Sequence, residues 1–168
     1  MSSPELDQLL AKQAITEVIY RYCRSMDRMD VELGYSVWHD GGTADYGSLF
    51  KGSGRGFIDW VTEYHRALQA QSHQVANILI EVDGDTARSE SYITVALFFA
   101  QEGRDMLNTG RGRYLDQWAR RDGRWAIMHR DFVLDFTDTR EVASSRPGWF
   151  KRDKSDRSYE VIKRIGNA

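Results

Sequence analysis

The second half of this chain consists of long segments rich in β-branched and aromatic residues, separated by tight-turn dipeptides. Asp83-Gly84 and Asp122-Gly123 are sequences that supply the positive φ angles of short hairpin turns. The four segments that we predict as strands cover residues 71–82, 86–101, 110–121 and 124–138. Strands joined by short turns are antiparallel neighbours, so the sequence predicts a sheet of consecutive hairpins and disfavours a doubly wound fold.

The first half has the periodicity of helices. Its apolar residues recur at the i, i+3, i+4 spacing of an amphipathic helix: Ile15, Val18, Ile19, Tyr22 and Met26. We expect this long helix over residues 7–29, and two shorter helices over residues 32–38 and 56–70. Helices followed by hairpins favour the α+β class, with the long helix packed on one face of the sheet.

Size and composition exclude several classes of protein. A chain of 168 residues is the length of one domain. Its net charge is −2, and the 23 basic and 25 acidic residues are interspersed, so neither a nucleic acid nor an anionic membrane is an expected partner. The single cysteine, Cys23, permits no disulfide framework and no cysteine-based zinc site, and we expect it to be buried.

Several common motifs are also absent. Residues 1–7 lack the basic and apolar regions of a signal peptide, and no stretch approaches about 18 uninterrupted apolar residues, so we expect a soluble, cytoplasmic protein. The glycine-rich residues 52–56 lack the G-x-x-x-x-G-K-[ST] pattern of a phosphate-binding loop. His39 and His65 lie in no metal-binding spacing, so no metal is expected.

His73 and Asp27 are candidates for proton transfer. A histidine can take a proton from carbon when a carboxylate holds its other ring nitrogen. Asp27 lies near the carboxyl end of its helix, where the helix dipole disfavours a negative charge, so it needs a compensating partner. The alternatives are a hydrogen-bonded structural role for His73, and for Asp27 either pairing with Arg24 or Arg28 or simple exposure beside Asp30.

Side chains alternate between the two faces of a β-strand, which predicts the residues that share a face with His73. His73 should lie on one face with Val75, Asn77 and Leu79, where the two polar side chains need partners if they are buried. Asn77 is therefore a candidate for contact with a substrate.

Arg130 should share its strand face with Met128, Phe132 and Leu134, opposite Trp125, Ile127 and His129. A guanidinium on an apolar face requires an acceptor or a water-filled cavity. Arg130 could bind a substrate oxygen or a leaving group, or pair with Asp116 or Asp131.

Two aromatic residues complete the set of candidates. The ring of Tyr22 lies on the main apolar stripe of the long helix, while its hydroxyl could point into a cavity. Trp38 is most simply a core residue, although a cavity for a ring-shaped ligand would also be lined by such side chains.

Several local strings resemble the SnoaL-like branch of the NTF2-like superfamily. They are Ala14-Ile15 with Tyr22 and Asp27, then His73, then Arg121-Asp122-Gly123-Arg124-Trp125 followed by Arg130. The resemblance covers residues 6–138. Members of this branch include gamma-hexachlorocyclohexane dehydrochlorinase, scytalone dehydratase, bile-acid 7-alpha-dehydratase and the SnoaL polyketide cyclases. It implies a cone in which a long helix and two shorter helices pack on a curved antiparallel sheet around an apolar pocket.

The resemblance also implies roles for the candidate residues. Asp27 would orient His73, and His73 would abstract a proton from carbon, while Arg130 and Tyr22 would stabilise an oxyanion or departing group in the pocket. The sequence departs from the bile-acid enzyme at Ala96, where that enzyme has a second aspartate, and it lacks the helix lysine of the dehydrochlorinase. The reaction type therefore stays open.

Two functions follow from this likeness. The first is a cofactor-independent lyase or isomerase that acts on a hydrophobic cyclic or aromatic small molecule, by dehydration, double-bond migration or ring closure. The second is a non-catalytic binding or assembly module, like the small subunit of aromatic-ring-hydroxylating dioxygenases.

The sequence further predicts an oligomer and a C-terminal arm. Residues 86–101 are apolar on both faces, which favours a homodimer or homotrimer packed sheet to sheet. We expect residues 1–138 to form the domain and residues 139–168, with Arg146-Pro147-Gly148, to leave it as an arm that ends in a helix near residues 159–165. Trp149 and Phe150 would then cover the pocket mouth or a neighbouring subunit.

Overall fold

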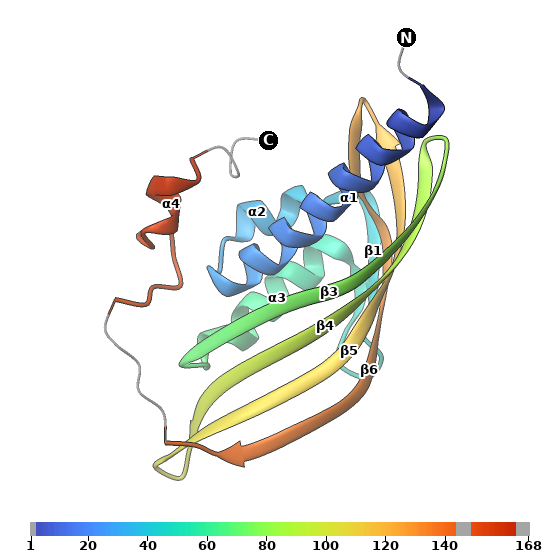
Figure 1. Cartoon of the computed structure of the whole chain (residues 1–168). Helices are drawn as coiled ribbons and strands as arrows, with labels where there is room; N and C mark the ends of the chain where they lie inside the picture. Colours follow the sequence, from blue (N-terminus) through green and yellow to red (C-terminus); the bar gives the residue numbers. More distant parts are fainter. Residues whose placement is uncertain (1–2, 144–148, 164–168) are drawn as a thin grey trace.

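The computed structural model describes residues 3–143 and 149–163. In this part of the chain, helices lie on one side of a strongly curved sheet (Figure 1). The helices are α1 (Pro4–Asp27), α2 (Val31–Ser36), α3 (Gly54–Arg66) and α4 (Ser158–Val161). The strands are β1 (Trp38–Asp45), β2 (Lys51–Ser53), β3 (Ala70–Asp83), β4 (Thr86–Gln101), β5 (Arg104–Arg121) and β6 (Arg124–Glu141).

The sheet confirms the predicted α+β class. Its strand order is β2-β1-β6-β5-β4-β3, and the four long strands β3, β4, β5 and β6 pair with one another in antiparallel succession. Gly84, Asp122 and Gly123 have positive φ angles in the turns where the sequence predicted them. The sheet also contains one parallel pair, β1 with β6, which local patterns could not reveal because it joins distant segments.

Helix α1 begins earlier than predicted because a capping residue precedes it. The Ser3 side chain accepts a hydrogen bond from the Leu6 N–H, and Pro4 occupies the first turn. The helix ends at Asp27, and Met29 shortly afterwards has a φ of 49°. The apolar stripe predicted for this helix is buried: Ile15, Val18, Ile19, Tyr22 and Met26.

The glycine-rich residues 52–56 start helix α3. The Ser53 hydroxyl accepts the Gly56 N–H, which caps the helix. A Cβ atom added to Gly54 would lie 2.1 Å from the Trp38 ring, so only glycine leaves room for that indole. Trp38 itself is 1% exposed and belongs to the core.

A β-bulge in β3 corrects the predicted face of Asn77. The register with β4 shifts between Ala76 and Leu79, and Asn77 has a φ of 48°. Asparagine tolerates this left-handed conformation better than most residues do. As a result Asn77 and Leu79 are exposed, and Ile78 and Ile80 pack on the core instead. The prediction that Asn77 shares a buried face with His73 was therefore wrong.

A second register shift corrects the predicted faces of β6. Gln117 pairs with His129 and the next residue of β5 pairs with Ile127, so Met128 is an extra residue in the ladder. Ile127 and Arg130 are consequently both fully buried, although alternation had placed them on opposite faces. His129 remains partly exposed and contacts the Thr43 hydroxyl at 2.7 Å.

The described part of the C-terminal segment, residues 149–163, packs against the same chain. The Tyr159 hydroxyl donates to Asp30 at 2.8 Å, and Arg152 donates to the backbone oxygen of His65 at 2.9 Å. Trp149 is 75% exposed, so it packs on little of the described part of the chain. The Arg146-Pro147-Gly148 sequence and Ile165 lie outside the described residues.

Candidate functional site

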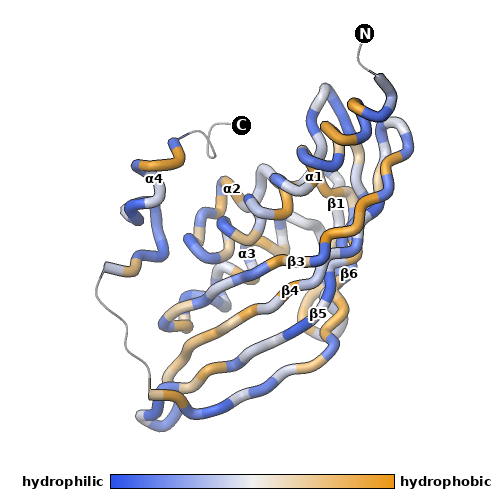
Figure 2. Tube along the Cα trace, viewed as in Figure 1, coloured by the Kyte–Doolittle hydropathy of each residue, from blue (hydrophilic) through white to orange (hydrophobic). Residues whose placement is uncertain are grey.

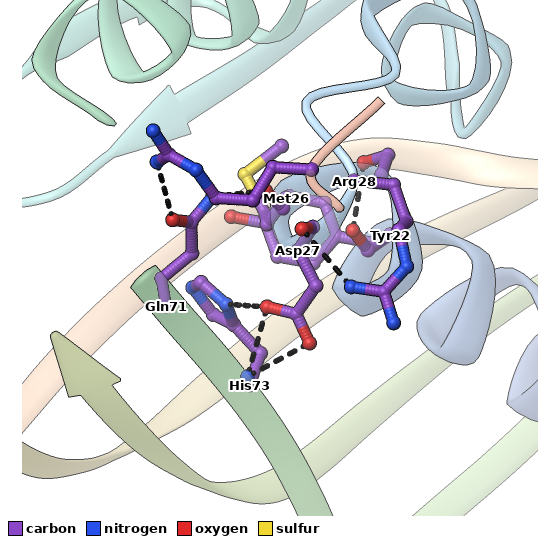
Figure 3. Close-up of polar contacts among 8 residues, drawn as sticks. Tyr22, Met26, Asp27, Arg28, Gln71 and His73 are labelled. Carbon is purple, nitrogen blue, oxygen red and sulfur yellow. Dashed lines mark hydrogen bonds and ion pairs between the residues drawn. The ribbon is translucent and has the colours of Figure 1, made fainter. Parts of the chain in front are cut away.

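Asp27 and His73 are in direct contact (Figure 3). Asp27 is the last residue of α1, and His73 lies near the start of β3. One carboxylate oxygen lies 2.7 Å from His73 Nδ1, and the carboxylate also accepts the His73 backbone N–H at 3.0 and 3.1 Å. With Nδ1 bonded to a carboxylate, Nε2 is the nitrogen that can act as a base.

The fold explains why these two residues meet. Strand β3 lies at the edge of the sheet, so the backbone N–H of His73 has no strand partner on its outer side. Asp27, placed at the carboxyl end of α1, would be disfavoured there by the helix dipole. The N–H groups of His73 supply the compensating partners. The predicted alternatives were ion pairs of Asp27 with Arg24 or Arg28, and neither forms in the described part of the chain.

A pocket of about 330 Å³ borders this pair. Its wall contains charged as well as apolar side chains: Tyr20, Cys23, Arg24, Asp27, Arg28, His73 and Val75. This wall is more polar than the apolar pocket that the sequence predicted. Burial raises the pKa of Cys23 to about 12, so its thiol is not a nucleophile at neutral pH.

Gln71 and Arg152 form hydrogen bonds next to the Asp27–His73 pair, and the sequence motifs predicted neither residue. The Gln71 amide donates to the Met26 carbonyl at 2.9 Å, next to Asp27. Arg152 donates to the Gln71 side-chain oxygen at 2.8 Å. Alternation along β3 places Gln71 on the face of His73 and could have revealed it, whereas no local signal places Arg152 there.

His65 is the second imidazole near the pair. Its ring centroid lies 5.8 Å from that of His73, and the residue is 4% exposed. Burial, together with the nearby His73 and Arg152, lowers the pKa of His65 to about 3. His65 is therefore neutral at physiological pH.

Arg130 lies elsewhere, in the core. It forms two hydrogen bonds with Asp116, at 2.6 and 2.8 Å, and both side chains are fully buried. Its guanidinium lies 4.2 Å from the ring centre of Tyr22 and 3.9 Å from that of Tyr114. Burial works against the charge, but Asp116 holds the pKa of Arg130 well above its usual value. This is the ion pair that the sequence offered as the alternative to substrate binding.

The remaining candidates are also separate from Asp27 and His73. The Tyr22 hydroxyl is hydrogen-bonded to that of Tyr46 at 2.9 Å, and burial raises the pKa of Tyr22 well above its usual value. Trp38 borders a different pocket, of about 270 Å³. Of the six predicted site residues, the structure thus brings Asp27 and His73 together.

Two absences concern the described residues alone. Within residues 3–143 and 149–163, no cluster of three or more histidine, cysteine, aspartate or glutamate side chains could hold a metal ion. Among the helices of the same residues, none combines the length and the apolar character needed to cross a membrane.

The fold and the comparisons define an NTF2-like protein, since solved structures of that class superimpose on most of the chain. A family model described as a SnoaL-like domain matches residues 7–131. The chain belongs to the SnoaL-like family, as its motifs predicted.

Three solved structures from Novosphingobium species have a similar fold. The hexachlorocyclohexane dehydrochlorinase LinA-type3 of Novosphingobium barchaimii has a TM-score of 0.75 at 16% identity, over 85% of this chain and 99% of that one. A candidate scytalone dehydratase of Novosphingobium aromaticivorans has a TM-score of 0.70 at 21% identity, over 84% and 95%. A candidate aromatic ring hydroxylase of the same organism has a TM-score of 0.68 at 19% identity, over 84% and 96%. At these identities the likeness shows the fold alone, and no curated protein matches the chain.

Proposed function

We propose that this protein is a cofactor-independent lyase or isomerase in which His73, oriented by Asp27, removes a proton from carbon. The observation that carries the proposal is the 2.7 Å contact between His73 Nδ1 and the Asp27 carboxylate beside a pocket. The carboxylate fixes the tautomer that leaves Nε2 free, and it stabilises the imidazolium that forms when Nε2 takes a proton. The chemistry is then a dehydration, an elimination, a double-bond migration or a ring closure.

The substrate that we propose is a small hydrophobic molecule, cyclic or aromatic. The family membership and the fold shared with a dehydrochlorinase and a candidate scytalone dehydratase support this class of substrate. Arg130 and Tyr22 are given no contact with the substrate in this proposal. Arg130 is held by Asp116, and the Tyr22 hydroxyl by Tyr46.

A screen of the purified protein tests the proposal. Aromatic, steroid and polyketide-like compounds would be incubated with the protein, and mass spectrometry would detect the loss of water or hydrogen chloride, while chromatography would detect isomers. Replacing His73 by Ala should slow turnover of any hit by roughly 10² to 10⁴-fold. Turnover by His73→Ala at the wild-type rate would contradict the mechanism and favour the second function, a non-catalytic binding or assembly module.

We also propose that the protein is a homodimer or homotrimer that buries the outer face of the sheet. On that face Tyr92 is 44% exposed and Phe136 is 60% exposed. Figure 2 shows that apolar residues continue along β4 toward its turn into β5. Sedimentation at micromolar concentration checks this proposal. A stable monomer would contradict it and would show that the outer face is exposed to solvent.

A further inference from the structure

One side of helix α1 presents two arginines to the pocket beside His73. Tyr20, Arg24 and Arg28 follow one another at intervals of four residues, so they lie on the same side of the helix. All three border the pocket of about 330 Å³, together with Asp27 and His73. The pocket wall next to the Asp27–His73 pair therefore carries two positive charges.

The two arginines differ in how their charges are compensated. Arg28 Nε lies 3.4 Å from the carboxylate of Asp156. Arg24 donates a hydrogen bond to the Ser158 hydroxyl at 3.1 Å, and its guanidinium lies 4.5 Å from the centre of the Tyr159 ring. No carboxylate in the described part of the chain forms an ion pair with Arg24. Its positive charge is therefore available to a ligand.

Arg24 also has an unused hydrogen-bond donor. Its Nε is buried, and no acceptor among the described residues contacts that atom. A buried donor without an acceptor is unfavourable. A guanidinium presents its Nε–H and a terminal N–H as a fork that matches the two oxygens of one carboxylate. A carboxylate would therefore satisfy both the charge and the donor of Arg24.

A second pocket continues from Arg24 toward apolar side chains. It measures about 490 Å³ and shares Tyr20 and Arg24 with the first pocket. Tyr20 is 52% exposed and Ile162 is 44% exposed, so both offer apolar surface to a ligand. Glu17 and Arg21, which also border this pocket, pair with each other at 3.5 Å and add no net charge.

We propose that these two adjoining pockets bind one amphipathic carboxylate, whose charged group pairs with Arg24 and whose ring contacts Tyr20 and Ile162. A singly charged carboxylate suits the uncompensated guanidinium better than a phosphate dianion does, because Asp27 lies on the same wall. The inference rests on the proposed function where it treats this ligand as the substrate of His73. It narrows the substrate class to aromatic or alicyclic acids.

The affinities of 2-naphthoate and 2-naphthamide test the inference, because the two compounds share a ring system and differ in charge. Isothermal titration calorimetry of the wild-type protein should give a Kd for the acid roughly 10-fold below that for the amide. Arg24→Met keeps an unbranched side chain without the charge, so it should bind the acid as weakly as the amide. Arg24→Lys should retain part of the preference for the acid because it keeps the charge.

Lys12→Gln is the matched control. It removes the same charge from an exposed position on α1 that borders neither of the two pockets, so both Kd values should stay unchanged. The melting temperature of each variant checks that it is folded.

The outcomes separate this inference from the proposed function. Equal wild-type affinities for the two compounds, or no binding of the acid at millimolar concentration, would overturn the inference and leave the proposed function in place. A preference for the acid that survives in Arg24→Met would also overturn it, as would an equal loss of acid and amide binding in that variant. If acid binding depends on Arg24 but no acid undergoes turnover that requires His73, the proposed function fails and the pockets belong to a binding module.

Discussion

The Arg130–Asp116 pair and the His73–Asp27 pair both hold a carboxylate against a nitrogen base, at 2.6 and 2.7 Å respectively. They differ in their surroundings. Both partners of the first pair are fully buried, whereas the side chains of His73 and Asp27 are 6% and 19% exposed beside a pocket. A guanidinium stays charged, while an imidazole can exchange a proton near neutral pH. The comparison supports a structural role for the first pair and the proposed proton transfer for the second.

Breaking the buried pair should have the largest effect on stability. Arg130→Met leaves Asp116 as an uncompensated charge in the core, so the free energy of unfolding should fall by about 3–5 kcal/mol. Replacing both residues, Arg130→Met with Asp116→Leu, should restore part of the loss because no charge remains buried. Urea denaturation measures both changes, and a loss below about 1 kcal/mol in the single variant would contradict the structural role.

Close packing elsewhere on the same two strands, β5 and β6, gives the next largest effect. A Cβ atom added to Gly112 would lie 2.3 Å from the Val133 carbonyl oxygen and 2.9 Å from the Phe132 ring. Gly112→Ala should therefore cost about 2–3 kcal/mol of stability. Gly110→Ala is the matched control on the same strand, since its nearest neighbour would be 3.7 Å away. Equal denaturation midpoints for the two variants would show that the core around Gly112 is not closely packed.

The acid sensitivity of the protein should depend on His65. Its pKa is about 3 in the folded protein and about 6.5 when unfolded, so between these values the unfolded chain binds an extra proton. Its contribution to stability is therefore lost as the pH falls below about 6.5. From pH 7 to pH 5 the free energy of unfolding should fall by about 2 kcal/mol more in the wild type than in His65→Phe. Urea denaturation at the two pH values checks this, and equal losses would contradict the burial of His65.

The pair beside the pocket should matter least to stability. Asp27→Asn keeps an oxygen that can accept the His73 backbone N–H, so the loss should be about 1 kcal/mol. The same urea denaturation series provides the value. A loss as large as that of Arg130→Met would remove the difference between the two pairs.

Local patterns predicted the elements better than the faces of the strands. Helical spacing located α1, and the Asp-Gly turns located the antiparallel strands. The faces of β3 and β6 changed where Asn77 and Met128 insert into the ladders, because an extra residue reverses the alternation beyond it. Only the pairing with β4 and β5 reveals these shifts.

The site was predictable in part for a similar reason. Family resemblance identified Asp27 and His73, which lie at positions that the motifs mark. His65 and Arg152 reach the same place only because α3 ends over β3 and the C-terminal segment returns to it. Such contacts depend on tertiary packing, and no spacing along the chain encodes them.

A double-mutant cycle on turnover tests the central claim most directly. With a substrate from the screen, kcat/KM would be measured for wild type, His73→Ala, Asp27→Asn and the double variant. If the two residues act as one unit, each single variant should lose roughly 10² to 10⁴-fold, and the double variant should lose little more than His73→Ala alone. Losses that multiply in the double variant, or a His73→Ala rate close to that of wild type, would contradict the account.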